Sequence, residues 1–108
     1  YTGRVKDLRM ELYDWQVNGE SFQIIDVREP HEYDIVNIGA VLVPLATVAA
    51  YAPNISRDTK VVIHCKMGGR SAKAIRELEE KFGFENLYNL KGGILGYIDE
   101  VKPELTKY

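Results

Sequence analysis

The sequence predicts an α/β fold, with a small parallel sheet of about four or five strands and helices on both faces. Short apolar runs rich in β-branched residues alternate along the chain with stretches of helical periodicity. Glycine, proline or asparagine marks most of the boundaries between these segments. Strands that alternate with helices favour parallel pairing, because each helix carries the chain back across the sheet.

The first segments are predicted to be a helix, a strand and a short helix. Apolar residues spaced by three or four form one helical face, in the order Val5, Leu8, Leu12 and Trp15. The apolar run over 22–27 indicates a buried strand. Pro30 suits the first turn of a short helix that extends to about Ile35.

The middle of the chain predicts two further strands with a brief helix between them. A short strand over 41–43 precedes a helix over 45–51. Residues 60–64 form the strongest predicted strand, because Val61-Val62-Ile63 is a run of three β-branched residues.

The last third of the chain predicts helix, strand and helix. An apolar stripe at helical spacing runs over 72–82, and Gly83 closes that helix. A strand follows over 87–90. Gly92-Gly93 then turns the chain into a final helix over about 94–101.

Length and composition describe one soluble domain over 1–108. Apolar residues make up 45% of the chain and charged residues 28%, as in ordinary globular proteins. No apolar run approaches the roughly 18 residues of a membrane span, and no segment reads as a signal peptide. We therefore expect a cytoplasmic protein with no membrane partner. The net charge of −2, with basic residues spread along the chain, argues against a nucleic-acid partner.

Cys65 is the single cysteine of the sequence, so it has no internal disulfide partner and belongs to no CxxC redox pair. A structural zinc site takes about four Cys and His ligands. The sequence has only two histidines, so we expect no metal. A lone cysteine is usually a small buried hydrophobe, and its surroundings must therefore carry any functional interpretation.

The residues around Cys65 predict an anion-binding loop. Cys65 follows a buried strand, at the sheet edge where α/β proteins bind ligands. Gly68 and Gly69 allow successive amide groups to turn inward, while Lys66 and Arg70 add positive charge. Such a site favours a thiolate and equally a persulfide anion, and it needs no metal and no organic cofactor. The alternative, an inert cysteine at a tight turn, leaves the clustered cations unexplained.

Four motifs, in order along nearly the whole chain, resemble those of rhodanese-like sulfurtransferases. The segment Cys65–Ser71 resembles the active-site loop of the family, which has the pattern Cys-x4-Arg. Residues 26–33 resemble its Asp-x-Arg…Glu-Tyr segment, residues 38–44 the segment before its next helix, and residues 90–93 its Gly-Gly signature. The resemblance implies an enzyme of the thiosulfate sulfurtransferase type, with a persulfide on Cys65.

Two places depart from the family pattern. The segment Val36–Ala40 is one residue shorter than the usual Gly-His-Ile-x-Gly-Ala and lacks its Gly and His, and Tyr97 replaces a usual Trp. Neither change touches the Cys loop. The shortened segment and the ending over 102–108 resemble the rhodanese domain that is fused C-terminally to ubiquitin-activating-like adenylyltransferases of molybdopterin and thiamine sulfur pathways.

The resemblance also implies roles for the loop residues. Cys65 is expected to be the nucleophile and sulfur carrier, and Arg70 to orient the loop or to bind an anionic donor. From its charge alone, Lys66 is expected either to steer an anion such as thiosulfate or to be a solvated loop residue, and Met67 to offer an apolar lip to the pocket. The residues expected to bind substrate, largely through backbone amides around the outer sulfur, are Lys66, Met67, Gly68, Gly69 and Ser71.

Polar residues at the strand ends are predicted to be structural. Asp26 and Arg28 are expected to brace the loops through hydrogen bonds, with Arg28 pairing with Glu32. His64 directly precedes the nucleophile. Adjacent strand residues point to opposite faces, however, which favours a packed histidine over a general base.

The expected partners are a small sulfur donor or a persulfide-bearing protein, and a sulfur-carrier protein as acceptor if the likeness to the fused enzymes holds. Three alternatives stay open. A phosphatase of the same fold has the pattern Cys-x5-Arg, one residue longer than the loop here. A non-catalytic interaction module often lacks the cysteine that this chain retains. A redox sensor would show reversible oxidation without sulfur transfer.

Overall fold

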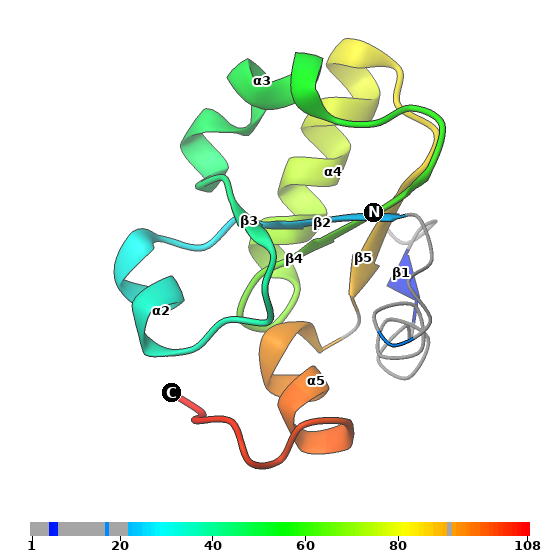
Figure 1. Cartoon of the computed structure of the whole chain (residues 1–108). Coiled ribbons are helices and arrows are strands. Elements are labelled where there is room, and N and C mark those ends of the chain that lie inside the picture. The colour runs from blue at the N-terminus through cyan, green and yellow to red at the C-terminus, as the bar shows by residue number, and fades with distance from the viewer. Residues whose placement is uncertain (1–4, 7–16, 18–21, 91) are drawn as a thin grey trace.

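The computed structural model describes residues 5–6, 17, 22–90 and 92–108 (Figure 1). Its strands are β1 (Val5–Lys6), β2 (Phe22–Asp26), β3 (Val41–Leu42), β4 (Lys60–His64) and β5 (Leu87–Leu90). Its helices are α2 (Pro30–Ile35), α3 (Val48–Tyr51), α4 (Gly69–Phe82) and α5 (Gly93–Glu100), with the 3-10 helices η1 (Leu45–Thr47) and η2 (Ala52–Asn54) on either side of α3.

The strands of the described residues form one sheet in the order β1-β5-β4-β2-β3, and each neighbouring pair is parallel. In the pairing of β2 with β4, Ile25 lies opposite Ile63 and Asp26 opposite His64. Because all strands run in one direction, their carboxyl ends share one edge of the sheet. The segments that follow Asp26, His64 and Leu90 therefore meet at that edge.

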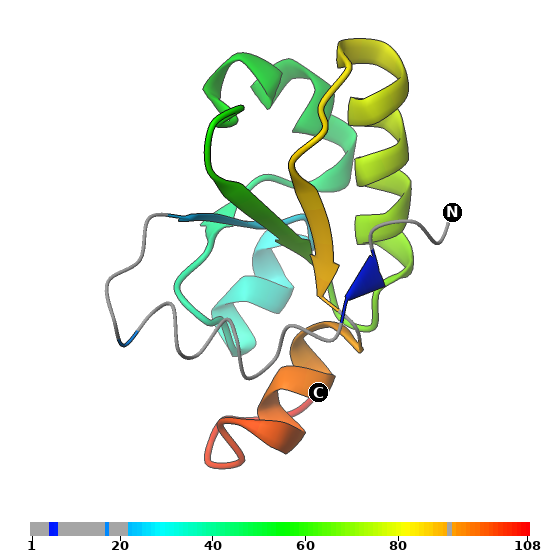
Figure 2. The same cartoon turned by 90° about the vertical axis from the view of Figure 1, so that its right-hand side faces the viewer.

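Helices cover both faces of the sheet, with α3 and α4 on one side and α2 and α5 on the other (Figures 1 and 2). Side chains of β4 alternate between these two layers. Val61 and Ile63 share a core cluster with Ile75 of α4, whereas Val62 packs with Tyr97 of α5. Burial on both faces explains why β4 is a continuous apolar run in the sequence.

The predicted α/β fold is confirmed, with a parallel sheet between two layers of helices. The strand over 60–64 and the helix over 30–35 have the predicted bounds. The brief helix predicted over 45–51 is interrupted, because η1 precedes α3. Within the described ranges, no helix is long and apolar enough to cross a membrane.

The predicted N-terminal helix is wrong at Val5. Val5–Lys6 forms β1, which pairs with Asn89 and Leu90 at the free edge of β5. Backbone groups at a sheet edge need hydrogen-bond partners, and Val5–Lys6 supplies them to β5. The pairing with β5 therefore decides the conformation of Val5, and the three-residue spacing from Val5 to Leu8 does not. The other residues of the predicted face, Leu8, Leu12 and Trp15, lie outside the described residues.

The helix after the Cys loop begins earlier than predicted. Gly69 and Arg70 belong to the first turn of α4 and not to the loop before it. Gly68 is the residue before the helix, and its φ of +116° is a conformation that glycine adopts without strain. The turn from β4 into α4 is therefore completed over residues 65–68.

Candidate active site

Cys65 lies directly after β4, at the carboxyl edge of the sheet. The residue is 1% exposed and belongs to the core cluster that α4 covers. Its Sγ accepts a hydrogen bond from the backbone amide of Gly68 at 3.1 Å and lies 3.4 Å from Oγ of Ser71. The sulfur therefore sits at the base of a short loop, with a backbone donor directed at it.

The start of α5 holds two carbonyl groups of this loop. The amides of Ile94 and Leu95 donate to the carbonyl oxygens of Cys65 and Lys66, at 2.9 and 3.2 Å. Gly93 allows the close approach, because a β-carbon there would lie 2.4 Å from the Lys66 oxygen. Its φ of +60° also favours glycine. These two requirements explain the second glycine of the Gly92-Gly93 turn.

A buried polar pair holds a third carbonyl group of the loop. The side-chain amide of Asn89 donates to the carbonyl oxygen of Gly68 at 3.1 Å, and the hydroxyl of Ser71 donates to Oδ1 of Asn89 at 2.6 Å. Asn89 and Ser71 are 2% and 0% exposed. Asn89 is a site residue that the sequence motifs did not identify. An asparagine inside the otherwise apolar strand β5 was the usable signal.

The loop presents amide groups on the side opposite to these carbonyl groups. In a trans peptide, the carbonyl of one residue and the amide of the next point in opposite directions. The carbonyl groups of Cys65, Lys66 and Gly68 are bonded elsewhere in the protein. The amides of Lys66, Met67 and Gly69 therefore point the other way. With the Gly68 amide already on the sulfur, these amides are compatible with the predicted anion-binding nest.

Arg70, in the first turn of α4, is tied to α2 by a bidentate ion pair. Its Nη1 and Nη2 donate to Oε1 and Oε2 of Glu32 at 2.6 and 2.9 Å. The arginine holds the pKa of Glu32 well below its ordinary value, and the carboxylate in turn raises the pKa of Arg70. The charge of Arg70 is thus compensated. Of its two expected roles, this geometry favours orienting the loop over binding a donor.

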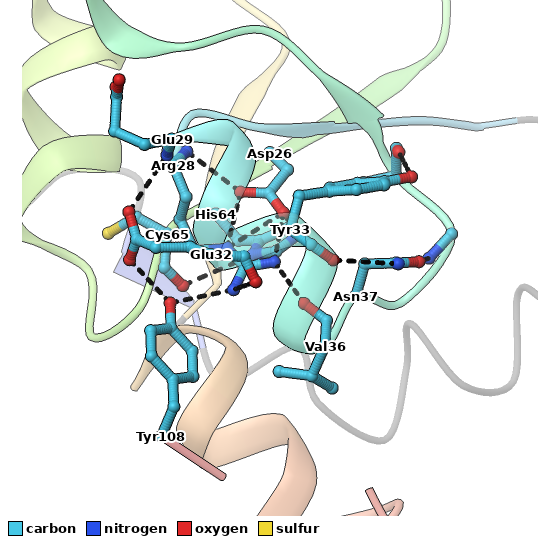
Figure 3. A network of polar contacts seen from close by, with 12 residues as sticks. Asp26, Arg28, Glu29, Glu32, Tyr33, Val36, Asn37, His64, Cys65 and Tyr108 are labelled. Carbon is cyan, nitrogen blue, oxygen red and sulfur yellow. Dashed lines mark hydrogen bonds and ion pairs between the residues drawn. The ribbon is translucent and has the colours of Figure 1, made fainter. Parts of the chain in front are cut away.

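Asp26 and Arg28 form an ion pair that is completely buried at the end of β2. Nη2 of Arg28 lies 2.6 Å from Oδ2 of Asp26, and Nε lies 2.9 Å from Oδ1. Arg28 also donates to the carbonyl oxygens of Glu32 and Val36, at 3.3 and 2.8 Å. Arg28 therefore binds the backbone carbonyl of Glu32, whereas the carboxylate of Glu32 binds Arg70. The predicted pairing of Arg28 with the Glu32 side chain is wrong. The pair of Asp26 and Arg28 braces α2 against the sheet (Figure 3).

His64 is buried beside this ion pair. Its Nδ1 lies 3.4 Å from the carbonyl oxygen of Cys65, and its Nε2 lies 3.8 Å from Oδ2 of Asp26. Among the described residues, Nε2 is a buried nitrogen without a hydrogen-bond partner. Burial lowers the pKa of His64. Nδ1 is within hydrogen-bond distance of a carbonyl oxygen and Nε2 faces a carboxylate at longer range, which agrees with a packed histidine.

Tyr108 contacts the same group of residues from the last segment of the chain. Its hydroxyl accepts a hydrogen bond from Nη1 of Arg28 at 2.8 Å and donates to Oε2 of Glu32 at 2.7 Å (Figure 3). Nζ of Lys66 lies 4.4 Å from the centre of its ring. Tyr108 was not predicted, because its contacts depend on the path of the preceding residues. Met67, next to Lys66, is 70% exposed.

Among the described residues, the ion pairs beside the loop leave the charge of Lys66 without a carboxylate partner. Asp26 balances Arg28, and Glu32 balances Arg70. In the part of the chain that the structure describes, Lys66 forms no ion pair and contacts the ring of Tyr108. The uncompensated positive charge of this group therefore lies on the residue after the cysteine.

A cavity of about 530 Å³ opens beside the guanidinium of Arg70. Its walls come from the start of α2, from η1 and from the exposed side of α4, and its lining residues are Glu29, Leu45, Ala46, Arg70, Lys73 and Glu77. Cys65 does not line it. The cavity therefore adjoins the first turn of α4 at Arg70.

Sequence comparison matches residues 9–100 to a family described as "Rhodanese-like domain". The probable adenylyltransferase/sulfurtransferase MoeZ of Mycobacterium tuberculosis is 37% identical over 101 residues, which cover 91% of this chain and 26% of that protein. The adenylyltransferase and sulfurtransferase UBA4 of Candida glabrata is 33% identical over 109 residues, which cover 91% of this chain and 25% of that protein. The chain thus spans about a quarter of the length of these curated relatives.

Solved structures show the same likeness. A rhodanese-like domain protein from Staphylococcus aureus superposes with a TM-score of 0.74 at 30% identity, over 86% of this chain and 90% of that chain. Reduced Bacillus anthracis CoADR-RHD gives a TM-score of 0.73 at 31% identity, over 93% of this chain and 17% of that chain. In both cases sequence and fold agree over most of the present chain.

Proposed function

The chain belongs to the rhodanese-like domain family, and from that premise we propose that it is a sulfurtransferase domain in which Cys65 carries sulfane sulfur as a persulfide. The observation that carries the proposal is the hydrogen bond from the Gly68 amide to the Cys65 sulfur, within a loop whose carbonyl groups are bonded elsewhere. Backbone donors around a sulfur stabilise its anionic form. They do so for a thiolate and for a persulfide alike.

The reaction divides into two displacements at sulfur. In the first, the thiolate of Cys65 attacks the outer sulfur of a donor such as thiosulfate. A new sulfur–sulfur bond forms, the donor's own sulfur–sulfur bond breaks, and sulfite leaves with its electron pair. In the second, a nucleophilic acceptor attacks the outer sulfur of the persulfide, and the Cys65 thiolate is the leaving group. Electrons and atoms balance without an external oxidant or reductant.

The geometry of the loop supports a slender, anionic donor. Cys65 is 1% exposed, so a reacting atom must enter the loop to reach its sulfur. The outer sulfur of thiosulfate or of a protein persulfide is a terminal atom that meets this requirement. Lys66, whose charge no carboxylate of the described residues balances, is placed to attract such a donor. We propose that Lys66, Met67, Gly68, Gly69 and Ser71 receive it.

The names of the relatives support a proposal about the acceptor. MoeZ and UBA4 are described as both adenylyltransferase and sulfurtransferase, and this chain matches about a quarter of each. We propose that the chain works beside an adenylyltransferase in a longer protein. The acceptor of its sulfur would then be a sulfur-carrier protein.

The decisive experiment is the intact mass of the protein after incubation with thiosulfate, and again after addition of cyanide. We expect a gain of one sulfur atom that cyanide reverses, with thiocyanate released. Cys65→Ser is the matched variant, since the two side chains are nearly isosteric, and it should fold and gain no mass. A protein that takes no sulfur from thiosulfate or from a persulfide donor contradicts the proposal. Loading of Cys65→Ser contradicts the assignment of the carrier.

A further inference from the structure

Tyr108 is held in a defined position beside the Cys loop. Leu105 and Tyr108 pack on an apolar cluster that includes Ile94 and Ile98 of α5. Lys107 adds an ion pair with Asp99 of the same helix. Figure 2 shows the last segment folding back along α5. The position of the tyrosine is therefore fixed by packing on α5 as well as by its hydroxyl.

The two ends of the Tyr108 side chain serve different parts of the loop. Its ring lies under the ammonium group of Lys66, 4.4 Å from Nζ. Its hydroxyl donates to Glu32, which in turn binds Arg70 through two hydrogen bonds. Lys66 follows the nucleophile, and Arg70 stands in the first turn of α4. A single aromatic residue thus connects the cations on both sides of the loop.

The hydroxyl of Tyr108 uses both of its hydrogen-bonding functions. It gives its one proton to Glu32 and accepts a proton from Arg28. Burial, the largest influence, raises the pKa of Tyr108, which keeps the hydroxyl protonated and able to donate at neutral pH. The ring is therefore anchored at its far end. A ring anchored in this way restricts where the ammonium group of Lys66 can lie.

We infer that Tyr108 is a positioning residue for sulfur loading, which holds the ammonium group of Lys66 beside the Cys65 loop so that an anionic donor is drawn to the sulfur. The inference rests on the proposed function and adds to it a residue from outside the loop. Its physical basis is the cation–π contact, together with the absence of a carboxylate partner for Lys66 among the described residues. The ring stabilises the position of the cation without cancelling its charge, as a carboxylate would.

The test measures the second-order rate of sulfur loading by thiosulfate across a range of salt concentrations. We compare Tyr108→Leu, which removes ring and hydroxyl, with Tyr108→Phe, which keeps the ring. Lys66→Gln removes the charge itself, and Lys81→Gln removes an equal charge near the far end of α4. Urea unfolding of each variant separates effects on loading from effects on folding. The double variant Lys66→Gln with Tyr108→Leu tests whether the two residues act together.

Lys66→Gln and Tyr108→Leu are each expected to slow loading about three- to tenfold, the range of a partly desolvated cation–π contact. Both should weaken the salt dependence, because the attraction that salt screens has been removed or displaced. The double variant should be no slower than the slower single variant. Tyr108→Phe should load faster than Tyr108→Leu, and Lys81→Gln should match the unsubstituted protein.

Three outcomes overturn the inference. One is a folded Tyr108→Leu variant that loads at the original rate with the original salt dependence. A second is a double variant whose losses simply multiply. If Tyr108→Leu does not fold, a Lys66→Gln variant with unchanged loading and salt dependence is the third. Failure of the unsubstituted protein to load at all is a different result, because it contradicts the proposed sulfurtransferase function itself.

Discussion

A β-carbon on Gly93 would lie 2.4 Å from the carbonyl oxygen of Lys66, so the first turn of α5 and the Cys loop touch through a glycine. The same hypothetical atom would lie 2.6 Å from the carbonyl oxygen of Cys65. The next two residues of the same turn, Ile94 and Leu95, donate their amides to these oxygens. The orientation of the loop around the sulfur therefore depends on a helix that begins more than twenty residues later in the chain.

We expect Gly93→Ala to lower the free energy of unfolding by more than about 2 kcal/mol, because the methyl group meets backbone atoms and the left-handed φ is strained for alanine. Gly69→Ala is the control. No atom lies within 4 Å of a β-carbon there, and its φ is not left-handed. Its unfolding free energy should change by no more than about 0.5 kcal/mol. Urea unfolding followed by circular dichroism measures both, and equal losses would contradict the close-approach argument.

The ion pair between Glu32 and Arg70 predicts a loss of stability in acid. Arg70 holds the folded pKa of Glu32 below its ordinary 4.5, so the unfolded carboxylate takes up a proton first as the pH falls. The contribution of the Glu32–Arg70 ion pair to the free energy of unfolding is complete well above pH 4.5, and it declines as the pH falls below 4.5. We therefore expect Glu32→Gln to be less stable than the unsubstituted protein at pH 6.5, and the difference between them to shrink as the pH falls from 4.5 to 3.

Urea unfolding at several pH values measures this convergence. Glu80→Gln, which removes an exposed carboxylate from α4, is the control and should not change the pH dependence. A Glu32→Gln variant that remains equally far below the unsubstituted protein at both pH values would show that the loss comes from packing and not from the ion pair.

The parts of the protein that local sequence determines were predictable. The bounds of β4 follow from its run of β-branched residues. The turn after β4 and the helix α4 follow from Gly68 and from the apolar stripe at helical spacing. The Cys loop is continuous in sequence, so its position at the end of β4 could be predicted from neighbouring residues alone. The first turn of α4 was placed too late, because Gly69 carries no side chain to mark the helical face.

The parts that distant residues determine were not predictable. Glu32 and Arg70 are 38 residues apart, and Tyr108 lies 76 residues from Glu32. Arg28 was expected to bind the carboxylate of Glu32, its neighbour in α2, but a distant arginine takes that position. Val5 was assigned to a helix because its edge pairing with β5 leaves no trace in the local pattern.

Asn89 is predicted to support loading more than folding. Asn89→Ala removes one hydrogen bond to the carbonyl of Gly68 and one from the hydroxyl of Ser71, which then keep their bond to each other and the bond from the Ala72 amide. We expect the loss of these two bonds to cost about 1–3 kcal/mol of unfolding free energy. Asn89→Ala should also slow the loading of sulfur from thiosulfate, because the carbonyl of Gly68 in the loop loses its hydrogen bond from the side-chain amide of Asn89. Asn86→Ala is a matched control, since Asn86 also bonds two backbone carbonyl groups, those of Ser56 and Thr59.

We expect Asn86→Ala to lower stability by a similar amount and to load sulfur at the original rate. Stopped-flow or quenched mass measurements of loading, set beside urea unfolding, separate the two effects. Equal slowing by both variants would mean that Asn89 acts on loading only through general stability.

His64 predicts a second decline in stability, at higher pH than that of Glu32. Burial lowers the folded pKa of His64 from its ordinary 6.5. As the pH falls below that value, the unfolded histidine binds a proton and the folded one does not, so stability decreases by at most roughly 1.4 kcal/mol per pH unit. His64→Leu should therefore flatten the change in unfolding free energy between pH 7 and pH 5. His31→Leu, at an exposed position of α2, should leave that change in place. If His64→Leu loses stability toward pH 5 as steeply as the unsubstituted protein, the buried histidine takes up its proton in the folded state, and the packed, neutral role assigned to it beside Asp26 is wrong.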